Sequence, residues 1–113
     1  GGRLSLYNKI RKVLLYPIPF WFYCRERAFH CLWIYISEDG KKVTLIERYN
    51  NSQDGIQHGI DFINGPNFEK FFEIFEIESF ITIGNASDEF KSWTSENGFE
   101  IEYRESIGGY VRK

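Results

Sequence analysis

The chain has 113 residues, of which 42% are hydrophobic and 27% are charged, and its formal net charge is −2. This length and composition are typical of one globular domain that can bury a single core, and the slightly negative charge excludes a general attraction to a long polyanion. No apolar run is long enough to span a membrane, so we expect no membrane-embedded segment.

The chain opens with Gly1-Gly2 and contains no methionine. A processed product, a tag scar or excision from a longer polypeptide would each explain this start. We interpret residues 1–113 as a single domain, and we favour excision from a longer polypeptide. The two cysteines, Cys24 and Cys31, do not make a disulfide framework. We therefore expect reduced thiols and a reducing compartment of the cytosolic type.

The first third of the chain predicts a helix and a short strand. Residues 4–14 carry apolar side chains at helical spacing, and Pro17 ends this helix. Residues 20–24 then form a short edge strand, because a proline precedes them.

Residues 28–37 are the strongest predicted strand, and their two faces differ. Aliphatic side chains alternate with an aromatic set that includes Trp33 and Tyr35. Asp39-Gly40 is a strong hairpin signal, so residues 42–49 are expected to return as the partner strand.

The stretch 50–67 shows no clear periodicity, and we expect a long loop there with a short strand at 59–63. Phenylalanines then recur at i, i+3, i+4 and i+7 over residues 68–75, which predicts a helix with one apolar stripe. This stripe matches the aliphatic face of the strand at 28–37, and we expect the two to pack together.

The C-terminal third predicts a strand, a helix and a strand. Residues 80–83 are typical of a buried strand, Ser87 is a good N-cap, and Gly98 closes the helix. Residues 99–103 form the next strand, parallel to the first if both share a sheet, and 110–111 form a last one. The fold class is therefore α+β, with a mixed, mostly antiparallel sheet that begins as a strand meander and packs on helices.

The aromatic face of the strand at 28–37 leaves two alternatives open. If the N-terminal helix covers it, the strand is central and buried on both faces. If nothing covers it, Trp33 and Tyr35 form a platform that stacks on a flat ligand. Stacking contributes about 1–3 kcal/mol per nucleobase and needs no net positive charge, and a methylated guanine cap would add cation–π attraction.

We therefore predict a non-enzymatic module that binds a nucleotide, an RNA cap or a short single strand. The predicted stacking residues are Trp21, Trp33, Tyr35 and Tyr49. The predicted contacts to base edges or phosphates are Lys42, Glu47, Arg48, His58 and Asp61.

Three segments in the middle of the chain read LIERY at 45–49, QHGIDF at 57–62 and PNF at 66–68. They resemble the strand end, the loop end and the helix start of the transcriptional positive-cofactor single-stranded-DNA-binding family. The resemblance implies nucleic-acid contacts from Lys42, Arg48 and Tyr49. Two features differ: the basic side chains of the family's loop are replaced here by Asp54, Gln57 and His58, and the C-terminal strand-helix-strand has no family counterpart.

A metal site or a catalytic cysteine is not expected. His30 and Cys31 are adjacent in a strand and point to opposite faces, and the chain has no Cys-x-x-Cys motif. No flanking motif supports a nucleophile pair of Cys24 or Cys31 with His58. We therefore expect binding rather than catalysis, without a metal or another cofactor.

The alternative function is that of a protein-binding module, such as a toxin-neutralising immunity protein or an antitoxin. Glutamates follow one side of the helix at 68–75 and continue beyond it, and such a surface could steer onto a basic nuclease partner. These glutamates are Glu69, Glu73, Glu76 and Glu78.

Overall fold

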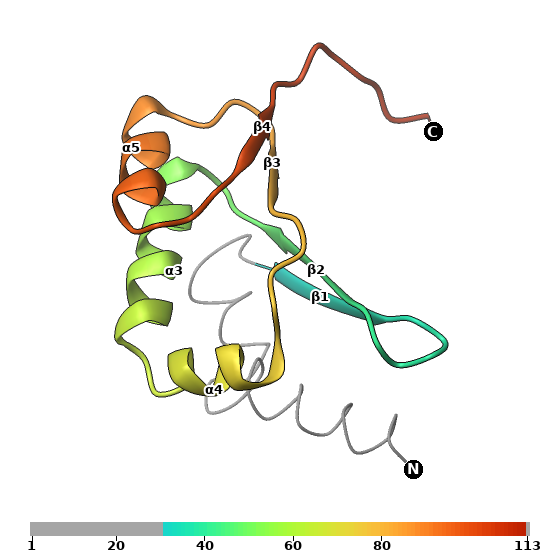
Figure 1. Ribbon diagram of the computed structural model, residues 1–113. Helices are drawn as coiled ribbons and strands as arrows, with labels where there is room; N and C mark the ends of the chain where they lie inside the picture. Colours follow the sequence, from blue (N-terminus) through green and yellow to red (C-terminus); the bar gives the residue numbers. More distant parts are fainter. Residues whose placement is uncertain (1–30, 113) are drawn as a thin grey trace.

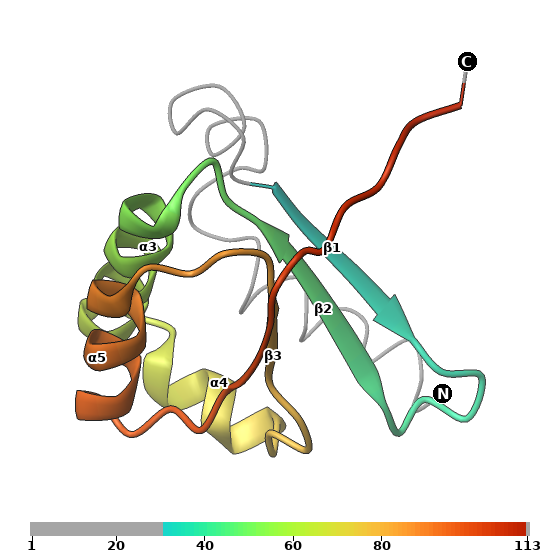
Figure 2. The same ribbon diagram turned by 90° about the horizontal axis from the view of Figure 1, so that it is seen from above.

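The structure of the protein is a computed structural model that describes residues 31–112. The helix predicted at 4–14, the strand predicted at 20–24, and Trp21, Cys24 and His30 lie outside the described residues. In the described part, helices α3 and α5 lie side by side, and a long β-hairpin extends away from them (Figures 1 and 2).

The hairpin consists of β1 (Cys31–Ile36) and β2 (Val43–Arg48), which pair antiparallel. Gly40 takes a positive φ of 73° in the connecting turn, a conformation that glycine adopts without steric cost. The Asp39 carboxylate accepts hydrogen bonds from the Ser37 hydroxyl at 2.6 Å and from the Lys41 N–H at 3.0 Å. The hairpin prediction is thus confirmed.

Residues 50–67 differ from the prediction, because most of them form helix α3 (Ser52–Asn64). The Asn51 side chain caps this helix by accepting a hydrogen bond from the Asp54 N–H at 2.9 Å. The predictions of a long loop here and of a strand at 59–63 are wrong. The helix was not predicted because two residues within it, Gly55 and Gly59, have low helix propensity.

Those two glycines allow α3 to pack closely against α5 (Asp88–Glu96). A Cβ atom on Gly55 would lie 2.9 Å from Cε2 of Phe90, and one on Gly59 would lie 2.4 Å from Cη2 of Trp93. Both distances are too short for a real Cβ atom. The glycines therefore allow the rings of Phe90 and Trp93 to pack directly against the backbone of α3.

Helix α4 (Phe68–Ile74) forms at the predicted phenylalanine stripe. The ring of Phe62 in α3 meets the rings of Phe68 and Phe71 at centroid distances of 5.3 and 5.2 Å, both edge to face. These edge-to-face contacts, an arrangement that aromatic pairs favour, join the stripe to α3. The packing partner predicted for the stripe was the aliphatic face of β1, whereas its ring contacts go to α3.

The C-terminal unit consists of β3 (Ile81–Ile83), α5 and β4 (Glu102–Arg104), and its two strands pair in parallel as predicted. The Ser87 hydroxyl accepts from the Phe90 N–H at 3.1 Å, which confirms the predicted cap. Gly98 follows α5 with a φ of 79°.

Within residues 31–112 the antiparallel and parallel pairs belong to two separate two-stranded sheets, not to one mixed sheet. The α+β class is confirmed, since the described part contains helices together with both kinds of strand pairing. Two finer expectations are wrong. Ile81 and Ile83 of β3 are exposed although a buried strand was predicted, and residues 110–111 form no strand.

Candidate functional site

The antiparallel register divides the hairpin into two faces. Residues directly opposite each other share a face, and successive residues alternate. The pairs Cys31–Arg48, Trp33–Ile46 and Tyr35–Thr44 therefore stand together on one side, which we name the outer face.

Trp33 and Tyr35 are strongly exposed on this outer face, with 59% and 54% of their surfaces accessible. Ile46, opposite Trp33, is 52% exposed. Because Trp33 and Tyr35 are two residues apart in one strand, their Cα atoms are separated by about 6.6 Å and their side chains project in the same direction. Trp33 and Tyr35 are thus exposed, and the N-terminal helix that the sequence offered as a cover for this face lies outside the described residues.

Arg48 gives the outer face its positive charge. It lies at the end of β2, opposite Cys31 and two residues beyond Ile46, and is exposed. This position is diagonal to Trp33, and diagonal neighbours in a sheet lie about 7–8 Å apart, within reach of a long side chain. The Arg48 guanidinium is therefore within reach of the Trp33 side of the outer face.

The opposite face of the hairpin, which we name the inner face, carries half-buried aliphatic side chains. Near its end it carries Glu47, whose Oε2 accepts a hydrogen bond from the Tyr49 hydroxyl at 2.8 Å. The other carboxylate oxygen, Oε1, lies 3.2 Å from Nε2 of His58 in α3, and the Tyr49 and His58 ring centroids are 5.6 Å apart. This inner cluster of Glu47, Tyr49 and His58 connects β2 to α3.

The inner cluster brings together three residues that the sequence suggested for ligand contact, but it lies on the other side of the hairpin from Trp33. Both oxygens of the Glu47 carboxylate have partners within the protein, and its side chain is only 30% exposed. The arrangement is thus suited to holding the hairpin against α3.

The remaining predicted residues are distributed elsewhere. The Lys42 ammonium lies 3.5 Å from a carboxylate oxygen of Glu78, with both side chains exposed. Asp61 is exposed on α3 and accepts a hydrogen bond from the Gln57 side chain at 2.9 Å. The predicted site residues therefore form an outer group (Trp33, Tyr35, Arg48) and an inner group (Glu47, Tyr49, His58), with Lys42 and Asp61 in separate surface interactions.

Sequence reasoning missed Ile46 and Thr44 as members of the outer face. Their position follows from the pairing register, which places them opposite Trp33 and Tyr35. The signal was present in the chain, because the Asp39-Gly40 turn fixes which residues pair across a hairpin.

Comparison of the chain with protein-family models, with curated proteins and with solved structures found no significant match. Among residues 31–112, no helix is long and apolar enough to cross a membrane. The same residues contain no group of three or more His, Cys, Asp or Glu side chains arranged to hold a metal ion.

Proposed function

We propose that the outer face binds nucleobases by stacking, either in a cap-like nucleotide or in a short single strand, without catalysing a reaction on them. One observation carries this proposal: Trp33 and Tyr35 project side by side from one face of β1, and each is more than half exposed. Large exposed aromatic side chains gathered on one face are typical of interaction surfaces.

Stacking supplies the main part of the binding energy in this proposal. Base–aromatic stacking contributes about 1–3 kcal/mol per base and tolerates any base, because each base has a π face. Two rings on one face can serve two successive bases of an extended strand. Ile46, which lies opposite Trp33 and two residues before Arg48, adds apolar contact on this face. Arg48 itself can reach a phosphate or stack on a base.

The electrostatic contribution is expected to be small. The whole chain carries a net charge of −2, and Arg48 is the single cation among the six residues of the outer face. For single strands the logarithm of the binding constant falls by about 0.7 per phosphate contact for each tenfold rise in salt. We therefore expect a shallow salt dependence. The logarithm of the binding constant should fall by about 0.7 for each tenfold rise in salt, the value for a single phosphate contact.

The experiment compares labelled oligonucleotides with bases against an otherwise identical abasic oligomer, by fluorescence anisotropy. Stacking predicts binding of the oligomer with bases and its loss with the abasic one. Tyr35→Ala should weaken binding about fivefold to 150-fold, the range that corresponds to one stacking contact. Tyr110→Ala is the matched control, because Tyr110 is an exposed tyrosine outside the hairpin. Equal binding of both oligomers, or equal effects of the two variants, would contradict the proposal.

A second arm distinguishes a cap-like nucleotide from a single strand. A methylated guanine is positively charged and gains cation–π attraction to an indole ring, by about 0.5–2 kcal/mol. Preference for a methylated cap analogue over GTP, lost in Trp33→Ala, would identify the cap. Equal affinity for both nucleotides, with tighter binding of an oligomer, would identify a single strand.

The second candidate function is neutralisation of a basic protein. It is supported by the exposure of the four glutamates in and after α4, namely Glu69, Glu73, Glu76 and Glu78. Such a surface steers association with a basic partner and acts mainly on the association rate. Immobilised basic ribonucleases provide the probe. Binding that is lost in Glu69→Lys/Glu73→Lys and kept in Trp33→Ala would favour this candidate over base stacking.

A further inference from the structure

The parallel sheet of β3 and β4 has an open edge along β4. Among the helices and strands that the structure describes, only β3 has Cα atoms within 8 Å of β4. A hydrogen-bonded strand on the other side would lie about 4.8 Å away, so β4 is an edge strand in this part of the chain. Residues 105–112 lead away from β4 toward the C-terminus and do not fold back along it (Figure 1).

The backbone of Tyr103 faces this open edge. The Glu102 N–H donates to the Phe80 carbonyl at 3.0 Å, and the Arg104 carbonyl accepts from the Gly84 N–H at 2.9 Å. The peptide groups of successive residues in a strand point to opposite edges, so the N–H and C=O of Tyr103 point away from β3. Such edge groups are a template for pairing with another chain.

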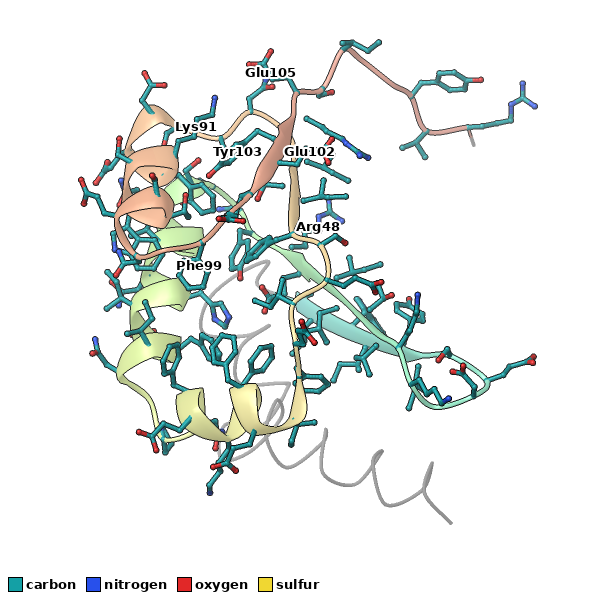
Figure 3. The ribbon with its side chains drawn as sticks, in the orientation of Figure 1. Arg48, Lys91, Phe99, Glu102, Tyr103 and Glu105 are labelled. Atoms are coloured by element: carbon teal, nitrogen blue, oxygen red, sulfur yellow. The ribbon has the colours of Figure 1, made fainter. Side chains whose placement is uncertain are left out.

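The side chains of β4 are divided between its two faces. The Tyr103 ring points toward α5, where its hydroxyl lies 2.7 Å from the Thr94 hydroxyl and the Lys91 ammonium lies 5.3 Å from the ring centre (Figure 3). Glu102 and Arg104 stand on the other face, and both side chains are more than half exposed. Their charges are opposite and are placed symmetrically about Tyr103.

This symmetry makes the strand complementary to a second copy of itself. When two such strands run antiparallel with Tyr103 opposite Tyr103, each Glu102 lies opposite an Arg104 of the other strand. The Tyr103 pair exchanges both backbone hydrogen bonds, and the flanking pairs are of the non-hydrogen-bonded kind, in which side chains approach most closely. Opposite charges in such pairs stabilise the pairing, and like charges destabilise it.

We propose that β4 is a dimerisation edge, at which two copies of the chain pair antiparallel about a two-fold axis through Tyr103. The pairing would extend two short parallel sheets into one of four strands. Isolated two-stranded sheets are marginal in water, and sheets of three or more strands are more stable. The pairing involves the three residues of β4 from each copy, far fewer than the roughly 20–30 residues a side of a standard interface, so we expect a weak dimer that forms reversibly.

The test is sedimentation velocity of the full chain over a concentration series. The wild-type chain should pass from monomer to dimer as concentration rises. Glu102→Arg places two arginines opposite each other, and Arg104→Glu places two glutamates opposite each other. Each substitution alone should raise the dissociation constant about tenfold or more, because both symmetry-related charge pairs become repulsive. Glu73→Arg makes the same charge change as Glu102→Arg on an exposed position of α4 and should leave the dissociation constant unchanged.

Two restorations make the register itself testable. Mixing Glu102→Arg with Arg104→Glu should give a heterodimer, because every cross-strand pair is again of opposite charge. The double variant Glu102→Arg/Arg104→Glu should dimerise as the wild type does, and it also keeps the 2.9 Å pair within each chain in reversed form. A wild-type chain that stays monomeric, single variants that dimerise normally, or a mixture that does not associate would each overturn the proposal.

Discussion

The contact between Gly59 of α3 and Trp93 of α5 offers a sharp test of the fold. Replacing glycine by alanine inside a helix normally stabilises it by about 1 kcal/mol. Here the added Cβ would lie 2.4 Å from Cη2 and 2.6 Å from Cζ3 of Trp93. Real Cβ atoms do not approach other atoms so closely, so the indole or the helix must move, and overpacking of this kind costs about 1–3 kcal/mol. The net effect of Gly59→Ala is therefore a loss of up to about 2 kcal/mol.

The assay is chemical denaturation followed by far-ultraviolet circular dichroism, arranged as a double-mutant cycle. Trp93→Leu removes the ring atoms that meet Gly59, so in that background Gly59→Ala should stabilise the protein by about the helix propensity difference. Gly55→Ala gives a graded comparison, because its closest atom is 2.9 Å away on Phe90. If Gly59→Ala stabilised the protein in the presence of Trp93, the proposed packing of α3 against α5 would be refuted.

Three further predictions concern hydrogen bonds. Thr94 is only 4% exposed. Thr94→Val should lower the free energy of unfolding by about 1–3 kcal/mol, because it leaves the Tyr103 hydroxyl without its partner. In denaturation experiments, adding Tyr103→Phe to Thr94→Val should largely remove that loss. Asn51→Ala should cost about 1 kcal/mol through loss of the α3 cap, measured by the shift in denaturation midpoint. Hydrogen bonds from the Ser37 hydroxyl, and then from the Lys41 N–H, lower the pKa of Asp39 below its ordinary 3.8. The ionised carboxylate therefore stabilises the turn above pH 3.8, and this contribution is lost as pH falls through the lowered pKa. An NMR titration of the Asp39 carboxyl should give a pKa below 3.8, and Ser37→Ala should raise that pKa.

Local signals account for the elements that the sequence predicted correctly. The hairpin depends on a turn dipeptide and on the alternation of its flanking residues, and α5 depends on a serine cap and a closing glycine. The phenylalanine stripe of α4 has a helical period that no strand could use. Each of these features is contained within one short continuous stretch of the chain, so tertiary packing was not needed to recognise it.

Helix α3 was missed because its sequence conflicts with helix propensity. Gly55 and Gly59 each disfavour a helix by about 1 kcal/mol relative to alanine, and they obscure the apolar spacing of Ile56, Ile60 and Ile63 at i, i+4 and i+7. The capping residue Asn51 was a second usable signal. Packing of Phe90 and Trp93 onto the glycines offsets the propensity, and that compensation comes from a segment some 35 residues away.

The candidate site was only partly predictable for a related reason. The alternation in β1 correctly placed Trp33 and Tyr35 on one face, but their exposure depends on what covers that face, which no local pattern states. The contact of Glu47 with His58 depends on α3 and could not be anticipated while residues 50–67 were expected to be a loop. Proximity in space between a strand and a helix is a property of the fold, not of either segment.

The fold also bears on the nucleic-acid binding that we propose for the hairpin. From the resemblance in the middle of the chain, the segment before the helix at 68–75 was expected to be a loop. Here Asp54, Gln57 and His58 belong to α3, where Gln57 bonds to Asp61 and His58 faces Glu47. With Lys42 beside Glu78 as well, the outer face retains Arg48 as its own cation. The proposed binding therefore depends on ring stacking, and the abasic oligomer and the salt slope, not affinity alone, would distinguish it from a general electrostatic attraction.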